Sequence, residues 1–419
     1  MDTRTVLGNG VRIVSERLAH SHSAAVGLWV DVGSRDEHDL NNGCAHFVEH
    51  MLFKGTRRRS AAQIATELDN LGGVSDAFTT RENTCFYAKV LDTHLERLLD
   101  LLLDMFGHSL FTPEEVERER QVVLQEIALV EDTPDDSIHD LFNARFFPHH
   151  PLGNPVLGSR EVVASLDAKK VLDYVARSYT PERILVTAVG NIDHQELVER
   201  VAPELGALPA RPQPWRRQPP GPALPSRTVY DKDLEQAHIV LGTQGRAVTS
   251  EDRYRLLLLN VLLGGNMSSR LFQEIRERQG LAYAVYSFLS SYQDAGCLGI
   301  YLGVEPAAAN RALALVRQEC RRLVDQAASL LELGNAKEFS KGNLFLSADS
   351  VESRMLRLAQ NELYFGRQVT LEEVAAGIDA VRPEEVRDLA AELMDWPAMT
   401  TVVLGPLAEA DLDWGEEGL

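Results

Sequence analysis

The sequence lacks the features of secreted and membrane-spanning proteins. Residues 1–8 contain no apolar signal core. The longest apolar stretch, at residues 256–263, is interrupted by Asn260 and is too short to span a bilayer. Only 4 cysteines occur among the 419 residues, and they do not have the spacing of a metal site. These absences predict a protein of the reducing cytoplasm with no membrane segment.

Basic residues are too few for a nucleic-acid-binding protein. The 42 Lys and Arg residues are outnumbered by 62 Asp and Glu residues, which gives a formal net charge of −20. Two short basic runs, Arg57–Arg59 and Arg216–Arg217, are expected to be solvated. The charge balance therefore argues against a nucleic-acid partner, while an apolar content of 44% is typical of a folded globular chain.

A proline-rich stretch divides the chain almost in half and predicts an extended linker. The predicted boundaries are an N-terminal domain at 1–212, a linker at 213–226 and a C-terminal domain at 227–419. Both halves repeat one order of strands, a helix, a glycine-ended helix and a strand pair. We therefore expect an α+β fold of two homologous α/β-sandwich domains, each a sheet with helices packed on one face, related by internal duplication.

The segment His46-Phe47-Val48-Glu49-His50 carries the strongest chemical signal. On a helix the two histidines lie about 40° apart, one turn from each other, and can bind one divalent ion. Glu49 lies about 60° to the other side of His46, within reach of that ion. The spacing is that of the inverted zinc-protease motif H-x-x-E-H. The five residues alone also fit a surface pair or a satisfied core pair, and a catalytic site needs a third ligand from elsewhere.

A second predicted helix, from Thr112 to Asp132, offers that ligand. On its helical wheel Glu126 lies at the centre of an apolar stripe, with four residues within about 60° of it: Val122, Val123, Leu129 and Val130. A carboxylate on a buried face needs a cation or a proton. The pattern alone leaves two hypotheses, an ion pair with a core Arg or Lys, or the third metal ligand.

Glu119 lies on the same face, about 20° from Glu126 but about 10 Å away along the axis. Zinc–oxygen bonds measure about 2 Å, so the two glutamates cannot both bind one ion. Glu119 is therefore expected to orient a ligand or the water.

Residues 43–56, Glu119 and residues 122–127 together resemble the pitrilysin/insulinase family of zinc metallopeptidases. The resemblance is closest to the bacterial relatives of the mitochondrial processing peptidase beta subunit, and it extends to 135–142 and 150–153. It implies a zinc-dependent endopeptidase in which Glu49 activates a zinc-bound water and Glu119 supports it. The implied ligands of one Zn²⁺ per chain are His46, His50 and Glu126.

The same resemblance implies how substrate is bound. The segment 74–79 matches the strand edge to which substrate adds, so Ala77, Phe78 and Thr79 are expected to bind substrate, although an ordinary strand start fits equally. Many relatives have Asn at the position of Asp76. Arg276 and Tyr283, in the second half, match a pair that binds the scissile carbonyl and stabilises the oxyanion.

One polypeptide thus carries both the zinc motif and the Arg276/Tyr283 pair, while the second half has no metal ligands at the matching position, residues 256–260. The resemblance implies a homodimer enclosing a clamshell-like chamber, or a heterodimer with a related subunit, acting on peptides or unfolded polypeptides. Two other classes compete. One is a non-catalytic, core-subunit-like scaffold, and the other is a structural zinc protein with Cys44 as the nearby fourth ligand.

Overall fold

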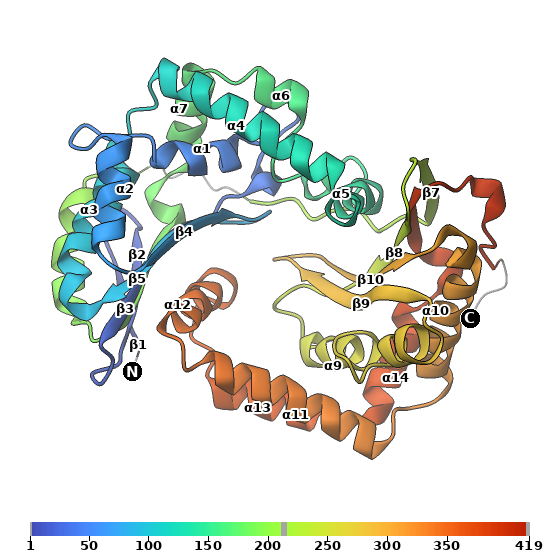
Figure 1. Ribbon diagram of the computed structural model, residues 1–419. Helices are drawn as coiled ribbons and strands as arrows, with labels where there is room; N and C mark the ends of the chain where they lie inside the picture. Colours follow the sequence, from blue (N-terminus) through green and yellow to red (C-terminus); the bar gives the residue numbers. More distant parts are fainter. Residues whose placement is uncertain (1, 211–215, 416–419) are drawn as a thin grey trace. The chain divides into compact units, whose positions relative to one another are not determined.

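The computed structural model divides into two compact units, each built on one β-sheet (Figure 1). It describes residues 2–210 and 216–415. Each unit is assembled from three segments of the chain. Unit 1 comprises Met1–Leu129, Asn154–Arg217 and Ser347–Gln368, and unit 2 comprises Val130–Gly153, Gln218–Leu346 and Val369–Leu419.

The sheet of unit 1 has six strands in the order β1-β2-β6-β3-β5-β4. Its strands β2 and β6 are parallel, and the other neighbours are antiparallel. The edge strand β4 packs beside α1 (Cys44–Leu52), the helix that carries the H-x-x-E-H motif. The strand bounds are β1 Asp2–Val6, β2 Arg12–Arg17, β3 Ser23–Val30, β4 Val74–Thr79, β5 Thr84–Leu91 and β6 Ile184–Gly190.

The sheet of unit 2 repeats this plan in five strands, in the order β7-β11-β8-β10-β9. Its parallel pair β7 and β11 corresponds to β2 and β6, and its antiparallel strands follow in the same order. The predicted α+β fold with an internal duplication is therefore confirmed. The bounds are β7 Ser226–Asp231, β8 Ala237–Gln244, β9 Ala282–Ser291, β10 Gly296–Val304 and β11 Thr400–Gly405.

The helices fall between these strands in a matching order. The α-helices that begin in unit 1 are α1 Cys44–Leu52, α2 Ala61–Asn70, α3 Leu95–His108, α4 Pro113–Asp132, α6 Arg160–Ala164, α7 Ala168–Ser178, α8 His194–Leu205 and α12 Val351–Gln360. Those that begin in unit 2 are α5 Pro134–Phe146, α9 Arg253–Leu263, α10 Ala309–Asp325, α11 Leu330–Ser347, α13 Leu371–Ala380 and α14 Pro383–Leu393. Two π-helices, η5 Phe272–Arg278 and η7 Asn361–Phe365, and short 3₁₀ turns complete the described part of the chain.

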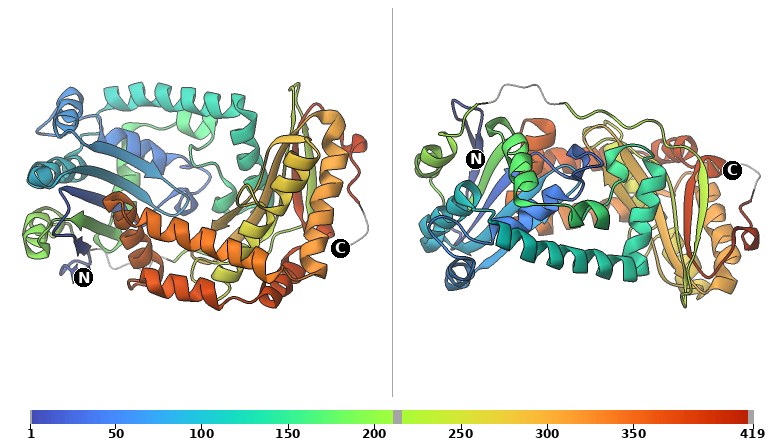
Figure 2. Two further views of the ribbon diagram at one scale, coloured as in Figure 1. Left: turned by 60° about the horizontal axis from the view of Figure 1, so that its bottom comes forward. Right: turned by 90° about the horizontal axis from the view of Figure 1, so that it is seen from above.

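The two faces of the first sheet are covered by helices from different halves of the chain. Successive side chains of a strand point to opposite faces, and on β3 Val26 and Leu28 pack with α3 and α8. Ala25 and Trp29 on the other face pack against α12, whose Met355 is fully buried (Figures 1 and 2). A helix more than 300 positions further along the sequence thus completes the core of unit 1.

The second sheet receives a helix from the first half in return. Ile138, Phe142 and Phe146 of α5 pack on a face formed by β8, β10 and β11. The other face packs against α9, α10 and α14. The units are therefore not the two consecutive halves that the sequence suggested. The predicted linker, 213–226, begins with residues 213–215, which lie outside the described part of the chain.

Arg217 corrects the expectation that the basic run 216–217 is solvated. Its side chain is only 4% exposed and pairs with Asp36 at 2.8 Å and with Asp31 at 3.0 Å. Glu82 is also buried here, paired with Arg35 at 2.6 Å. A run of two arginines gives no sign of which one is buried, because the acids that bind Arg217 lie far away in the sequence.

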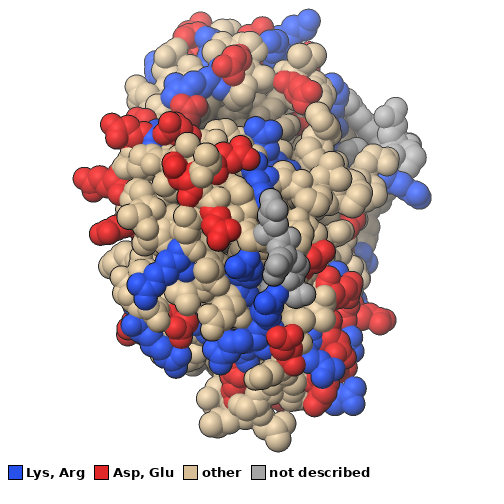
Figure 3. Space-filling view, turned by 90° about the vertical axis from the view of Figure 1, so that its right-hand side faces the viewer, with Lys and Arg blue, Asp and Glu red and all other residues tan. Residues whose placement is uncertain are grey.

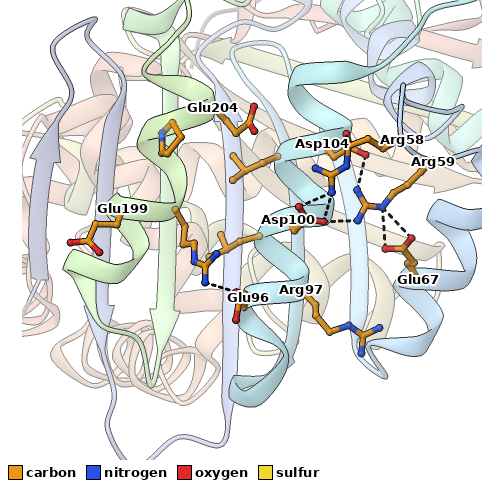
Figure 4. A pocket seen from close by; sticks show the side chains of 13 residues that line it. Arg58, Arg59, Glu67, Glu96, Arg97, Asp100, Asp104, Glu199 and Glu204 are labelled. Carbon is orange, nitrogen blue, oxygen red and sulfur yellow. Dashed lines mark hydrogen bonds and ion pairs between the residues drawn. The ribbon is translucent and has the colours of Figure 1, made fainter.

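The run 57–59 is also partly structural. Arg59 pairs with Asp104 at 2.7 Å and with Glu67 at 3.0 Å, and Arg58 pairs with Asp100 at 2.6 Å. These residues line a cavity of about 550 Å³ whose wall is formed mainly by charged side chains (Figure 4). The ion pairs attach the loop that follows α1 to α2 and α3.

The surface carries charges of both signs. On the face that Figure 3 shows, acidic and basic side chains are interspersed. Unit 2 also contains exposed ion pairs such as Arg278 with Glu274 at 2.7 Å. Within the ranges that the structure describes, no helix is long and apolar enough to cross a bilayer.

Replacing Arg217 by Met should destabilise unit 1. The change leaves the buried Asp36 carboxylate without its cation, and breaking a buried ion pair costs roughly 3–5 kcal/mol. We expect the thermal unfolding midpoint to fall by several degrees in calorimetry. Arg216→Met, which changes the exposed neighbour, should leave the midpoint unchanged. Equal midpoints for the two variants would contradict the role assigned to Arg217.

Candidate metal centre

The H-x-x-E-H motif lies on α1, a short helix that is apolar on nearly all sides. Its buried residues include Phe47, Val48 and Met51, which pack in one cluster with residues of α4 and α7. Such a helix is held by core packing rather than by solvent contacts. The polar residues His46, Glu49 and His50 therefore need partners of their own.

The start of α1 is fixed by a buried acid. The carboxylate of Glu37 accepts the backbone N–H groups of Gly43 at 2.8 Å and Ala45 at 2.6 Å. These donors would otherwise be unpaired at a helix N-terminus. Gly43 has a φ of 95°, and a Cβ there would lie 2.6 Å from the carbonyl oxygen of Leu157, so only glycine fits.

The side chains of His46, His50 and Glu126 converge in unit 1. Glu126 Oε2 lies 3.7 Å from His46 Nε2 and 3.6 Å from His50 Nε2. One ligand atom from each residue lies within 4.8 Å of the others. Tetrahedral zinc with bonds of about 2.0–2.1 Å separates its ligand atoms by about 3.3–3.5 Å. The three residues therefore fit one zinc ion with small movements.

The electrostatics of His46 also suit a metal ligand. Burial, together with the neighbouring His50, lowers the pKa of the His46 imidazole to about 3. The ring is therefore neutral near pH 7, as a metal requires. Its Nδ1 atom is buried without a hydrogen-bond partner among the described residues.

Glu126 joins the cluster, but its surroundings differ from the expected buried stripe. The buried residues of α4 are Val116, Glu119, Val123 and Ile127. Val122 and Leu129, which the wheel placed beside Glu126, are exposed. Glu126 itself is 39% exposed at its side chain and lies at the border of the buried face. The helical wheel therefore selected a residue that does lie beside His46 and His50, but it was wrong about which side of α4 is buried.

Glu49 stands beside the three converging residues and has a different partner. Thr79 Oγ1 donates a hydrogen bond of 2.5 Å to Glu49 Oε2. Burial raises the pKa of Glu49, an effect that this hydrogen bond and His50 partly offset. Nearby Glu126 raises that pKa further. A carboxylate fixed beside the three converging residues, without being one of them, is positioned as a general base would be.

Glu119 is the deeply buried acid of α4, only 3% exposed at its side chain. Its Oε2 lies 3.2 Å from His50 Nδ1, and its Oε1 lies 2.8 Å from Lys54 Nζ. The structure thus places Glu119 behind one imidazole, where it can orient that ring. The motif pattern alone gives no reason to single out Lys54, although it follows His50 by four positions.

The strand β4 divides its side chains between two environments. Ala77 lines a cavity of about 280 Å³ together with Glu49, His50 and Lys54. Phe78 points to the other face of the sheet, where it packs edge-on against Trp29 with ring centroids 5.6 Å apart. Any contact of Phe78 with an added strand would therefore come from its backbone. Asp76 accepts the backbone N–H of Ala77 at 2.9 Å.

Arg276 and Tyr283 lie together in unit 2, whereas the converging residues lie in unit 1. The Arg276 guanidinium lies near two rings, 4.9 Å from the centroid of Phe272 and 5.1 Å from that of Tyr283. Tyr283 is largely exposed, and both residues line a cavity of about 420 Å³. Their role in the active site stays a prediction of the sequence.

Sequence comparison finds relatives that align with nearly the whole chain. Residues 12–160 match the insulinase family (peptidase family M16), and residues 165–339 match the peptidase M16 inactive domain. An uncharacterized zinc protease of Streptomyces coelicolor is 40% identical over 97% of this chain and 90% of its own. The uncharacterized zinc protease YmxG of Bacillus subtilis is 42% identical over 94% of this chain and 96% of its own.

Two solved structures share the fold. A protease from Helicobacter pylori has a TM-score of 0.91 at 23% identity, covering 97% of this chain and 99% of its own. A peptidase M16 inactive domain from Pseudomonas fluorescens has a TM-score of 0.90 at 20% identity, covering 97% and 98%. At these identities the likeness concerns the fold alone.

Glu126→Ala should weaken zinc binding more than roughly 100-fold, because changes to groups behind a ligand already cost about 10–100-fold. The affinity is measured by competition with chelators of graded strength. Glu117→Ala, which removes an exposed acid of the same helix, is the matched control and should retain zinc. Equal affinity in the two variants would rule out Glu126 as a ligand.

Proposed function

Because the chain belongs to the insulinase family of peptidases, family M16, we propose that it is a zinc-dependent endopeptidase. It would bind one zinc ion per chain through His46, His50 and Glu126. The observation that carries this proposal is the convergence of these three side chains with Glu49 held beside them by Thr79. When bound, zinc supplies Lewis-acid activation of water and of the peptide carbonyl.

Glu49 carries the proton in the proposed reaction. Its carboxylate takes a proton from the attacking water as the water oxygen bonds to the carbonyl carbon. As the C–N bond breaks, Glu49 passes that proton to the leaving amine nitrogen. Thr79 keeps one carboxylate oxygen in place throughout, which leaves the other oxygen for the water.

Glu119 holds the imidazole of His50 through Nδ1, which orients Nε2 towards the metal position. The non-catalytic scaffold alternative is not favoured, because the ligands, the base and the supporting acid are all present and close together. A structural zinc site is disfavoured by its usual requirement for four nitrogen or sulfur ligands.

Substrate is proposed to add to β4 as an extra strand. This strand is at the edge of its sheet, and Ala77 lines the same cavity as Glu49 and His50. Strand addition aligns a peptide through main-chain hydrogen bonds and so tolerates many side chains. The substrate class is therefore peptides or unfolded polypeptide segments.

The assembly and the compartment are proposed from the sequence. A homodimer is favoured over a heterodimer, because one chain carries both the motif and the Arg276/Tyr283 pair. The four cysteines are buried free thiols, which supports a reducing compartment.

Glu49→Gln should keep zinc and lose hydrolysis. Loss of a positioned base lowers kcat by roughly 10²–10⁴-fold. The rate is measured with a quenched fluorescent peptide, and the zinc content of the same sample is measured in parallel. Glu114→Gln, an exposed change on α4, should retain the full rate. Full activity of Glu49→Gln would show that another group is the base.

Strand addition predicts an alternating response to backbone methylation. After the cleaved bond has been mapped by mass spectrometry, single N-methyl groups are placed along the peptide. Because alternate residues of an added strand direct their N–H groups towards β4, methylation should raise KM strongly at every second position. A uniform effect, or none, would contradict binding at a strand edge.

A further inference from the structure

The turn that ends α1 places a lysine behind the metal centre. Lys54 follows His50 by four positions, and its backbone N–H bonds to the carbonyl of Met51 at 3.1 Å. The helical course of this turn directs the Lys54 side chain along the same side as His50. Lys54 Nζ lies 2.8 Å from Glu119 Oε1, and Glu119 Oε2 lies 3.2 Å from His50 Nδ1.

Resting on the zinc site of the proposed function, we propose that Lys54 is a positioning residue. Acting through Glu119, it fixes the imidazole of His50 in the orientation that binds the metal. Glu119 divides its two oxygens between the two partners, so the ammonium holds the carboxylate and the carboxylate holds the ring.

Burial explains why Glu119 needs this cation. A carboxylate removed from water is destabilised unless it is paired and hydrogen-bonded. Glu119 is 3% exposed, and two further acids, Glu49 and Glu126, lie around the same pair of histidines. Without Lys54, one oxygen of Glu119 would lose its ionic partner, and the carboxylate could turn away from His50.

The loop that follows Lys54 is itself fixed by hydrogen bonds. Thr56 Oγ1 donates to Asp104 at 2.7 Å, and Arg59 donates to the same oxygen at 2.7 Å. Thr56 N–H also bonds to the carbonyl of Arg59 at 2.8 Å. Asp104 is completely buried on α3, so this loop is fastened to the core of unit 1 (Figure 4).

A direct role in substrate binding is the competing explanation, because Lys54 also lines the cavity beside β4. The ammonium is already paired with Glu119 at 2.8 Å, and the exposed acid of that cavity, Asp76, accepts a hydrogen bond from its own strand instead. The geometry therefore favours a role through Glu119.

The test is the zinc affinity of Lys54→Met, which keeps an unbranched side chain one atom shorter and removes the charge. Loss of a group that orients a metal ligand costs roughly 10–100-fold in affinity, and we expect that loss in chelator competition with zinc alone. Lys54→Arg should recover most of the affinity. Lys89→Met, which changes a lysine of β5 that pairs with Glu352, is the matched control and should bind zinc normally.

A double variant separates the two explanations. If Lys54 acts through Glu119, Lys54→Met should weaken zinc binding little further in a Glu119→Gln background. Additive losses would overturn the proposal, as would Lys54→Met with normal zinc affinity and a raised KM. Melting curves of the zinc-free proteins verify folding. If Lys54→Met does not fold, Lys54→Gln carries the same test.

The affinity is measured without peptide, so it is independent of the proposed hydrolysis. Loss of affinity in Lys54→Met alone supports the role of Lys54 even if the wild-type protein cleaves no peptide, a result that would overturn only the proposed function. A wild-type protein that binds no zinc would overturn both.

Discussion

The packing of α1 against α4 is the constraint on which the metal centre depends. Phe47, Val48 and Met51 of α1 share one core cluster with Val123 and Ile127 of α4. This contact sets the distance between the two histidines and Glu126, which belong to helices far apart in the sequence. It also buries Glu119, and the partners of that acid, His50 and Lys54, both come from the end of α1. The metal centre is thus a group of polar side chains at an otherwise apolar contact between two helices.

The local parts of this centre could be predicted from the sequence. Helical geometry alone places His46, Glu49 and His50 around one point. The glycine-ended helix expected in the first half is α2, which is followed by Gly72 with a φ of 63°. The helical wheel that selected Glu126 rested on a less specific pattern. Apolar residues occupy a wide arc of α4, and its pattern does not reveal which part of that arc is buried.

The partnerships between distant segments could not be predicted. Periodicity shows that a helix has an apolar face but does not identify the surface that covers it. Helix α5 comes from the first half of the chain but completes the core of unit 2. Helix α12 comes from the second half but completes the core of unit 1. Arg217 is similar, since its burial depends on Asp36 and Glu82, well over a hundred positions earlier. Lys54 was overlooked because its partner, Glu119, lies on another helix.

The duplicated sheets show how one fold plan supports two roles. Helix α9 occupies in unit 2 the place that α1 has in unit 1, between corresponding strands, but it contributes leucines to the core where α1 carries the proposed metal ligands His46 and His50. The proposed chemistry therefore depends on a few residues of α1 and on the acids of α4, while the same fold in unit 2 does without them.

X-ray absorption spectroscopy of the zinc-loaded protein tests the central claim most directly, because it identifies the atoms bound to the metal. The account predicts only nitrogen and oxygen neighbours, at about 2.0–2.2 Å, with the multiple-scattering signature of two imidazoles. A sulfur neighbour at about 2.3 Å, or a shell with fewer than two imidazoles, would contradict binding by His46, His50 and Glu126.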